Sequence, residues 1–208
     1  MTAHGHRPVV IVGAGGHGRE IFSVVRATGR RFLGFVDDGQ PDLERIERLG
    51  TPLLGRIDEL ASLECEFVIG VGNERARQQI AERLAQTREA STSVIHPTAT
   101  VGPDVTWGAG FVAFAHAAVT TNVRLGAHTH LNQHAAVAHD CRVGSYVTVG
   151  PGARLSGNVA IGDGTMIGAA ACVLPGVSIG RECRIGAGAV VTNNVPDRTT
   201  AIGVPARW

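Results

Sequence analysis

From Ile95 to Val190 this chain divides into sixteen consecutive six-residue blocks without an insertion. The first position of nearly every block is aliphatic, the second is often Gly, and the fifth is small or β-branched. A helix repeats every 3.6 residues and a strand alternates every two, so a period of six fits neither. It is typical of a hexapeptide β-helix, in which each block forms one short strand and one corner.

Three blocks complete one coil of such a prism, so residues eighteen apart should stack on one another with coils roughly 4.8 Å apart. Sixteen blocks then predict about five coils. The first-position aliphatic side chains should point inward, while Gly, Asn and Asp suit the strained corners. The spacing alone does not give the handedness, although the general crossover rule favours a right-handed coil.

The composition agrees with a narrow prism and excludes several functions. The chain is 44% hydrophobic but only 4% aromatic, and its net charge of +1 without a basic stripe argues against nucleic acid. No apolar run approaches the ~20 residues that span a bilayer, and MTAHGHRP is not a signal peptide, so we expect a cytoplasmic protein without membrane insertion. Cys65, Cys141 and Cys183 lie at buried-looking positions, which favours reduced packing residues over disulfides.

The first 94 residues have a different pattern. Buried strands are predicted over Pro8–Gly13, Phe32–Asp38 and Glu66–Gly72, with helices after the first glycine-rich turn and from Asn73. Alternating strands and helices predict a small Rossmann-like parallel α/β sheet. The fold class is therefore α/β plus all-β, with one domain over 1–94 and a β-helix over 95–208.

The glycines of the first turn suggest a nucleotide site. Gly13, Gly15 and Gly18 satisfy G-x-G-x-x-G between a strand and a helix, and Asp37 follows at about the distance of a ribose-binding acid. A dinucleotide fold needs a second half that this chain has no room for, so one nucleotide is expected, most simply a nucleotide-sugar with its pyrophosphate at the helix start. The alternative is that the glycines only permit tight strand-to-helix packing.

Taken together, the GAGGHG turn, the VDD segment at 36–38, the HDC segment at 139–141 and the GVPAR ending resemble the sialic-acid O-acetyltransferase-like family over essentially the whole chain. That family includes N-acetyltransferases acting on nucleotide-linked 4-amino-sugars, such as those making bacillosamine and perosamine. The resemblance implies a left-handed parallel β-helix, acetyl-CoA as cosubstrate, a homotrimer with active sites between neighbouring prisms, and a role in surface glycan synthesis.

The resemblance also implies roles for individual residues. His139 is expected to be the general base, with Asp140 as the acid beside it. The nucleotide-sugar should be held by Gly13, Gly15, Gly16, His17, Gly18, Asp37, Asp38, Gly72 and Asn73. Acetyl-CoA should be held by Thr148, Gly157, Gly168, Ala169, Gly186, Gly203, Pro205 and Ala206. No metal is expected.

The six-residue register supports the catalytic assignment independently. Gly157 lies eighteen residues after His139, so a residue without a side chain should stack on the imidazole, leaving room for a thioester and a backbone N–H for the oxyanion. Asp140 should stack between Asn122 and Asn158, and whether its carboxylate reaches the imidazole or only holds the corner stays open. Imidazole suits proton removal near neutral pH, and no activated Ser or Cys competes, so direct transfer is favoured over an acyl-enzyme.

Other histidines of the repeat region are further candidates for the site. For His134, an ordinary corner residue is favoured over a residue that lines the cleft. Thr148 stands where relatives often carry a second histidine, with His130 one coil below. A γ-type carbonic anhydrase would use His134 and His139 as zinc ligands, but its third ligand would fall at Thr98.

Two other enzymatic functions stay open on this fold, O-acetylation of a sugar or sialic acid and fatty-acyl transfer. A non-enzymatic sugar-nucleotide scaffold is disfavoured, because His139, Gly157 and the GVPAR segment are all present.

A flat alanine-rich face also favours assembly. Apolar surface there should be covered by a partner, which is consistent with a closed trimer. The alanines concerned are Ala113, Ala115, Ala117 and Ala118.

Overall fold

The computed structural model describes residues 7–86 and 91–208. The chain forms two compact units, Met1–Val94 and Ile95–Trp208. Most of the opening MTAHGHRP segment, on which the expectation about a signal peptide rests, lies outside the described residues. In the part of the chain that is described, no helix has the length and apolar character needed to cross a bilayer.

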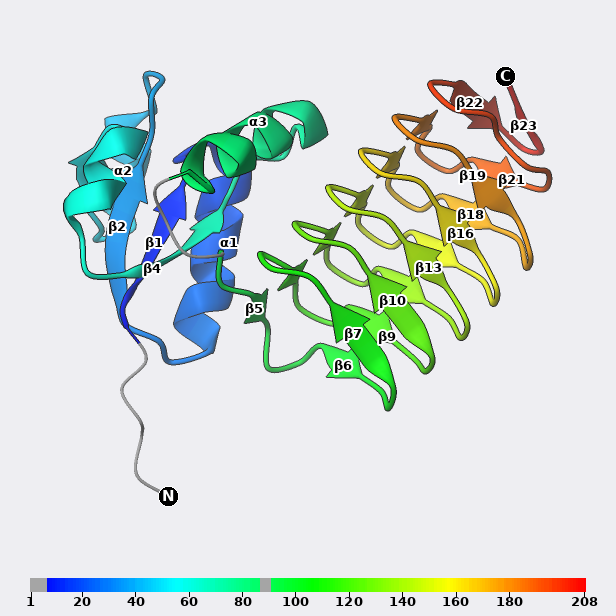
Figure 1. Ribbon diagram of the computed structural model, residues 1–208, viewed down its shortest axis with the longest axis horizontal. Helices are drawn as coiled ribbons and strands as arrows, with labels where there is room; N and C mark the ends of the chain where they lie inside the picture. The colour runs from blue at the N-terminus through cyan, green and yellow to red at the C-terminus, as the bar shows by residue number, and fades with distance from the viewer. Residues whose placement is uncertain (1–6, 87–90) are drawn as a thin grey trace. The chain divides into compact units, whose positions relative to one another are not determined.

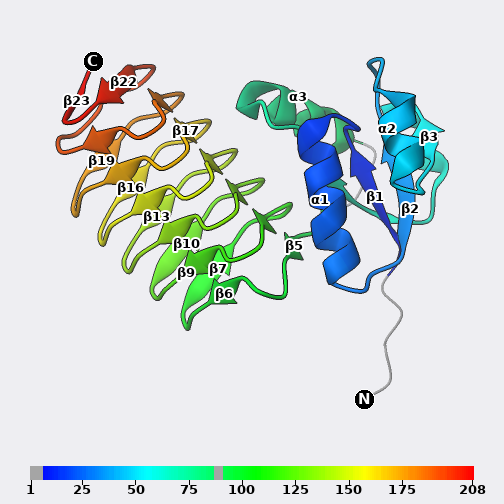
Figure 2. The same ribbon diagram turned by 180° about the vertical axis from the view of Figure 1, so that it is seen from behind.

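The first unit is built on a four-stranded parallel sheet in the order β3-β2-β1-β4 (Figures 1 and 2). The predicted parallel α/β architecture is confirmed, but the sequence analysis missed the short edge strand β3. The strands are β1 (Val9–Val12), β2 (Phe32–Val36), β3 (Leu53–Gly55) and β4 (Glu66–Ile69). The helices are α1 (Gly16–Ala27), α2 (Leu43–Arg48), the 3-10 helix η1 (Ile57–Ser62) and α3 (Glu74–Leu84).

Helix α1 begins inside the glycine-rich turn and runs beside β1 (Figure 2). The sequence analysis placed the whole Gly13–Gly18 segment in a turn, but Gly16 to Gly18 form the first helical turn. This early start needs close backbone approach, because a side chain on Gly18 would overlap the carbonyl group of Gly13. Glycine at that position therefore has a structural cause.

The second unit is a parallel β-helix, as predicted, with an eighteen-residue register through its repeats (Figure 1). Ala118 pairs with Ala136, and Ala136 pairs with Arg154. The strands form three sheets, of which the five-stranded one has the order β19-β16-β13-β10-β7. The strands of the repeats are β5 (Val94–Ile95), β6 (Thr100–Val101), β7 (Val105–Trp107), β8 (Val112–Ala113), β9 (Ala118–Val119), β10 (Val123–Leu125), β11 (His130–Leu131), β12 (Ala136–Val137), β13 (Arg142–Val143), β14 (Thr148–Val149), β15 (Arg154–Leu155), β16 (Ala160–Ile161), β17 (Met166–Ile167), β18 (Cys172–Val173), β19 (Ser178–Ile179), β20 (Arg184–Ile185) and β21 (Val190–Val191).

The register loses two residues at the end, where Arg184 pairs with Thr200. There β22 (Thr200–Gly203) and β23 (Ala206–Arg207) form an antiparallel hairpin. Cys65, Cys141 and Cys183 are buried free thiols, as expected.

Stacking of the coils explains the glycines at the second position of many blocks. A Cβ on Gly162 would lie 2.6 Å from the backbone nitrogen of Arg181, and one on Gly168 would lie 2.6 Å from that of Ala187. Real Cβ atoms do not approach backbone so closely, so these positions exclude larger residues.

From the second block on, the fourth position takes the left-handed backbone conformation. It has a positive φ in every block from Asp104 to Gly188, whichever residue stands there. His116, His128 and His134 all occupy this position, with φ of 60°, 54° and 58°. Because His is enriched among non-glycine residues at positive φ, corner geometry accounts for much of the histidine cluster.

Candidate functional site

The imidazole of His139 and the carboxylate of Asp140 form a hydrogen-bonded pair on one corner of the β-helix. His139 Nδ1 lies 2.7 Å from Asp140 Oδ2. Both side chains are open to solvent, with exposed fractions of 62% and 51%. Since an ionised carboxylate only accepts, Nδ1 donates. In the neutral imidazole Nε2 then has the lone pair that a general base needs.

The hydrogen bond from His139, and then the one from Asn122, lower the pKa of Asp140 below its ordinary value. The question left open by the sequence is thus answered, because the carboxylate does reach the imidazole.

Gly157 stacks on this imidazole as the eighteen-residue spacing predicts. A Cβ on Gly157 would lie 2.5 Å from Nε2 and 3.1 Å from Nδ1 of His139. The space that glycine provides is therefore filled by the ring itself. This corrects the expectation that the gap admits a thioester; an oxyanion role for the Gly157 N–H stays a prediction.

Several other predicted residues lie elsewhere on the prism. His134 belongs to a different corner, where its ring stacks on that of His116 with centroids 5.0 Å apart. His130 and Thr148 are paired neighbours on β11 and β14, and both are buried. A single chain therefore does not bring Thr148 to the corner that carries His139.

The first unit presents an open helix N-terminus at the glycine-rich turn. Gly15 and Gly16 are exposed, and no atom lies within 4 Å of where a Cβ would stand on either. Gly15 has φ of −66°, so the turn does not require a positive φ there. Because Gly15 and Gly16 have no side chains, a ligand can approach the backbone N–H groups at the start of α1.

Asp37 fixes the shape of this turn. Its Oδ2 accepts a hydrogen bond of 2.7 Å from the backbone N–H of Ala14, and its Oδ1 accepts one of 2.7 Å from Gly39. The carboxylate therefore ties the end of β2 to the glycine-rich turn.

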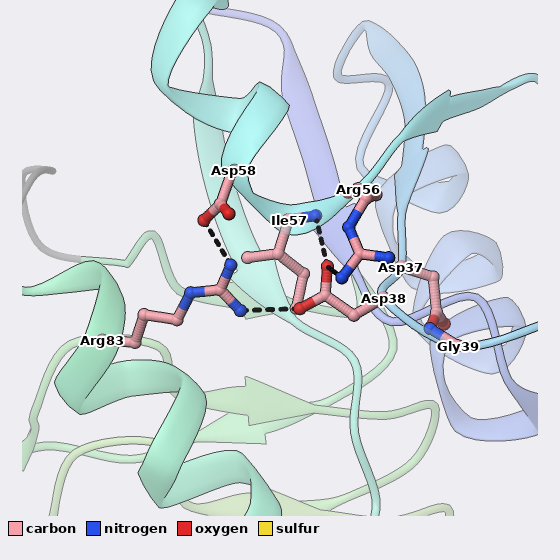
Figure 3. Close-up of polar contacts among 7 residues, drawn as sticks. All are labelled: Asp37, Asp38, Gly39, Arg56, Ile57, Asp58 and Arg83. Carbon is pink, nitrogen blue, oxygen red and sulfur yellow. Dashed lines mark hydrogen bonds and ion pairs between the residues drawn. The ribbon is translucent and has the colours of Figure 1, made fainter.

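Asp38 takes part in an ion-pair network instead (Figure 3). Its Oδ2 accepts from Arg83 Nη1 of α3 at 2.6 Å, and its Oδ1 accepts from the backbone N–H of Ile57 at 3.0 Å. Arg83 also bonds Asp58, as Figure 3 shows. The hydrogen bond from Arg83 is the largest influence that lowers the pKa of Asp38. Sequence analysis missed Arg83, because nothing in a helical pattern indicates which arginine turns toward a distant carboxylate.

The loop after β4, at residues 70–73, is held by Arg77. This residue is fully buried, and sequence analysis missed it as well. Its Nη1 donates to the carbonyl oxygens of Val71 at 2.9 Å and Gly72 at 3.2 Å. Asn73 caps α3, accepting a hydrogen bond of 2.9 Å from the Ala76 N–H. Gly72 and Asn73 therefore have structural roles, and their predicted contact with a nucleotide-sugar stays a prediction.

His17 lies in the first turn of α1 and is mostly buried, with an exposed side-chain fraction of 15%. Burial, and then the charge of Arg77, lower the pKa of His17 from 6.5 to about 4. The imidazole is therefore neutral at pH 7. In this state it adds no positive charge to the candidate phosphate site.

Acid should destabilise the first unit through His17. Below pH 6.5 the unfolded chain takes up a proton that the folded chain refuses until about pH 4, so stability falls through that window and levels off below it. The loss should reach about 2 kcal/mol by pH 5. Urea unfolding at pH 7 and pH 5 should show a smaller difference for His17→Gln than for the wild type. An equal difference in both proteins would contradict the neutral, buried state of His17.

The residues predicted to hold acetyl-CoA differ in accessibility. Gly168 is buried, Gly186 faces Ile202 of the terminal hairpin, and the side chain of Ala206 is fully buried in the core. Ala169, Gly203 and Pro205 are exposed. The exposed residues can therefore contact a ligand, whereas the buried side chain of Ala206 cannot. Within residues 7–86 and 91–208, no three His, Cys, Asp or Glu side chains gather as metal ligands do.

Family models match parts of both units. The model of the PglD N-terminal domain matches residues 8–84, and the hexapeptide repeat of succinyl-transferase matches residues 158–193. The chain is 37% identical to UDP-N-acetylbacillosamine N-acetyltransferase of Bacillus subtilis, over 51% of this chain and 51% of that protein. The chain thus spans about half the length of that relative in the match.

Two solved structures match along nearly the whole chain. PerB from Caulobacter crescentus, in complex with CoA and GDP-perosamine, is 34% identical with a TM-score of 0.89 and 96% of both chains covered. The acetyltransferase domain of PglB from Neisseria gonorrhoeae, in complex with acetyl coenzyme A, is 36% identical with a TM-score of 0.90, covering 98% of this chain and 99% of that one.

Proposed function

Because the chain belongs to the PglD-type nucleotide-sugar N-acetyltransferases with hexapeptide repeats, we propose that it transfers the acetyl group of acetyl-CoA to the amino group of a nucleotide-linked amino-sugar, for surface glycan synthesis. The observation that carries the proposal is the His139–Asp140 pair. It presents a basic imidazole nitrogen on the β-helix of an acetyltransferase family.

The reaction is a direct transfer in a ternary complex. The lone pair of the amino-sugar nitrogen attacks the thioester carbonyl carbon, and His139 Nε2 takes the proton that this nitrogen loses. The carbon–sulfur bond then breaks, and the CoA thiolate leaves and receives the proton. Asp140 holds the Nδ1–H tautomer and stabilises the imidazolium while the proton is on the ring.

The nucleotide-sugar binds the first unit, with its pyrophosphate on the N–H groups at the start of α1. Support comes from Gly15 and Gly16, which are exposed and have open space where a side chain would stand. Asp37 shapes the glycine-rich turn of this site by accepting a hydrogen bond from the Ala14 N–H. Asp38 contributes by holding Ile57 and Arg83 in place through hydrogen bonds. Acetyl-CoA binds the later coils, where Ala169, Gly203 and Pro205 are the exposed members of the predicted set.

Replacing Gly15 by Val tests the nucleotide site. The structure has open space for the new side chain and an ordinary φ, so the substitution should obstruct a ligand without straining the fold. KM for the nucleotide-sugar should rise about tenfold or more, with KM for acetyl-CoA nearly unchanged. Gly18→Ala is the contrasting variant, because its Cβ would overlap the Gly13 carbonyl group and should lower stability. Equal effects of Gly15→Val on both substrates would show that the loop is only structural.

The experiment that tests the function is a panel of UDP-, GDP- and dTDP-linked 4-amino-sugars with acetyl-CoA, followed by thiol release. Release with at least one amino-sugar and none with sialic acid is expected. Release with sialic acid alone would favour O-acetylation instead.

We also expect a homotrimer, although for a different reason than the sequence suggested. Ala113 and Ala117, assigned to an outer face, are each 1% exposed and belong to the core, so that assignment was wrong. The side chain of His139 is 62% exposed in a single chain. Acyl transfer to an amine needs shielding from water, so the site requires a cover. A neighbouring prism can supply that shielding. Sedimentation of a monomer at micromolar concentration would contradict both the trimer and a shared active site.

A further inference from the structure

The carboxylate of Asp140 is held from two sides, one oxygen for each partner. Oδ2 meets His139 Nδ1 at 2.7 Å, and Oδ1 accepts a hydrogen bond of 3.2 Å from Asn122 Nδ2. Asn122 lies eighteen residues before Asp140, at the same corner of the preceding coil. The backbone φ values are 56° and 62°, so both residues occupy the left-handed corner position.

The orientation of the Asn122 amide follows from its neighbours. The carboxylate of Asp140 can only accept, so Asn122 must present its NH₂ group to it. The carbonyl oxygen of the amide then faces the hydroxyl of Thr121, at 3.4 Å. The shorter contact of that hydroxyl, 3.0 Å, is to the carbonyl oxygen of Pro103. Asn122 therefore donates a hydrogen bond to Asp140 and accepts none from it.

A half-exposed carboxylate that bonded only the imidazole would rotate about its own axis and exchange that bond for water. A second donor, anchored on another coil, fixes the carboxylate plane. The oxygen that faces Nδ1 then stays in place, which favours the tautomer with a basic Nε2.

We propose that Asn122 is a positioning residue for acetyl transfer, acting on His139 through Asp140. The inference rests on the proposed function of His139 and adds a residue to it. Hydrogen bonding by Asn122 is the second largest influence that lowers the pKa of Asp140, which agrees with this geometry.

The charged and titratable groups around the pair are few. On the preceding coil, Arg124 is occupied by Asp104, with Nη2 3.0 Å from Oδ1. On the pair's own coil stand Arg142, which is exposed, and the buried thiol of Cys141, whose pKa burial raises. The next coil contributes Gly157 and Asn158, which do not titrate.

Asn158 provides a matched control for Asn122. It lies one coil on the other side of Asp140, with φ of 57°, and the contact it contributes is its backbone N–H, which donates to the His139 carbonyl oxygen at 2.8 Å. Replacing either Asn by Gly keeps the left-handed backbone and the backbone hydrogen bonds while removing the side chain. Only Asn122→Gly removes a donor to Asp140.

The first measurement is steady-state kinetics. Asn122→Gly should lower kcat about tenfold, with both KM values within about twofold of the wild type. Asn158→Gly should leave kcat and both KM values unchanged. A kcat for Asn122→Gly equal to that of the wild type, or an equal loss in both variants, would overturn the proposal.

The second measurement does not depend on activity. Nitrogen NMR of histidine-labelled protein without substrates should show His139 mainly as the Nδ1–H tautomer in the wild type and in Asn158→Gly, and a mixture of tautomers in Asn122→Gly. The same tautomer population in all three proteins would overturn the role of Asn122, whether or not the wild type acetylates an amino-sugar. If the tautomer mixture appears in Asn122→Gly as expected but the wild type shows no turnover, the proposed function is contradicted and the role of Asn122 in orienting the ring is not.

Discussion

Replacing His139 by Ala should lower kcat by about 10²- to 10⁴-fold, the usual contribution of general-base catalysis. Both KM values should change little, because the side chain is 62% exposed and lies on a corner, outside the aliphatic core. A loss in kcat without a loss in binding identifies an interaction made in the transition state. Steady-state kinetics with a nucleotide amino-sugar and acetyl-CoA measures both quantities.

His134→Ala is the control for this prediction. The ring of His134 stacks on that of His116 at another corner, whereas the imidazole of His139 is paired with Asp140. Its loss should therefore cost much less activity than the loss of His139. If purified His139→Ala kept more than about a tenth of wild-type kcat, the base would have to be sought elsewhere.

The repeat region was largely predictable because one number fixes it. A six-residue period places the aliphatic first positions inside the prism, and an eighteen-residue stacking interval places Gly157 on His139 and Asn122 beside Asp140. The same register explains why histidines gather at corners, where the backbone has a positive φ. What the register does not fix is side-chain rotation. The contact between Asp140 and the imidazole, and the filling of the Gly157 gap by the ring, therefore became visible only in the structure.

The first unit was predictable only in outline. Hydrophobic strands and glycine spacing predicted its sheet and the turn at Gly15, but short elements such as β3 carry too little periodicity to be recognised. The roles of Asp37 and Asp38 also differ for reasons that local sequence does not contain. One carboxylate meets the N–H of Ala14, which lies 23 residues away, and the other meets Arg83, which lies 45 residues away. Such contacts depend on tertiary structure.

Replacing Gly157 by Ala should have the second largest effect on activity. The new Cβ would lie 2.5 Å from His139 Nε2, closer than non-bonded atoms approach, so the imidazole must turn away from its present position. Misplacement of a catalytic group by about 1 Å can cost about 10²-fold, so we expect kcat to fall about 10- to 100-fold. KM values and thermal stability should change little, because the ring that gives way is an exposed side chain rather than backbone.

A double mutant shows whether this loss runs through the imidazole. In the His139→Ala background the obstructing ring is absent, so Gly157→Ala should cost no further activity, and the two effects should be far from additive. Gly162→Ala serves as the structural contrast, because its Cβ would meet the backbone nitrogen of Arg181 and should lower stability instead. Wild-type kcat in Gly157→Ala, or full additivity with His139→Ala, would mean that the position of this ring does not govern the transfer step.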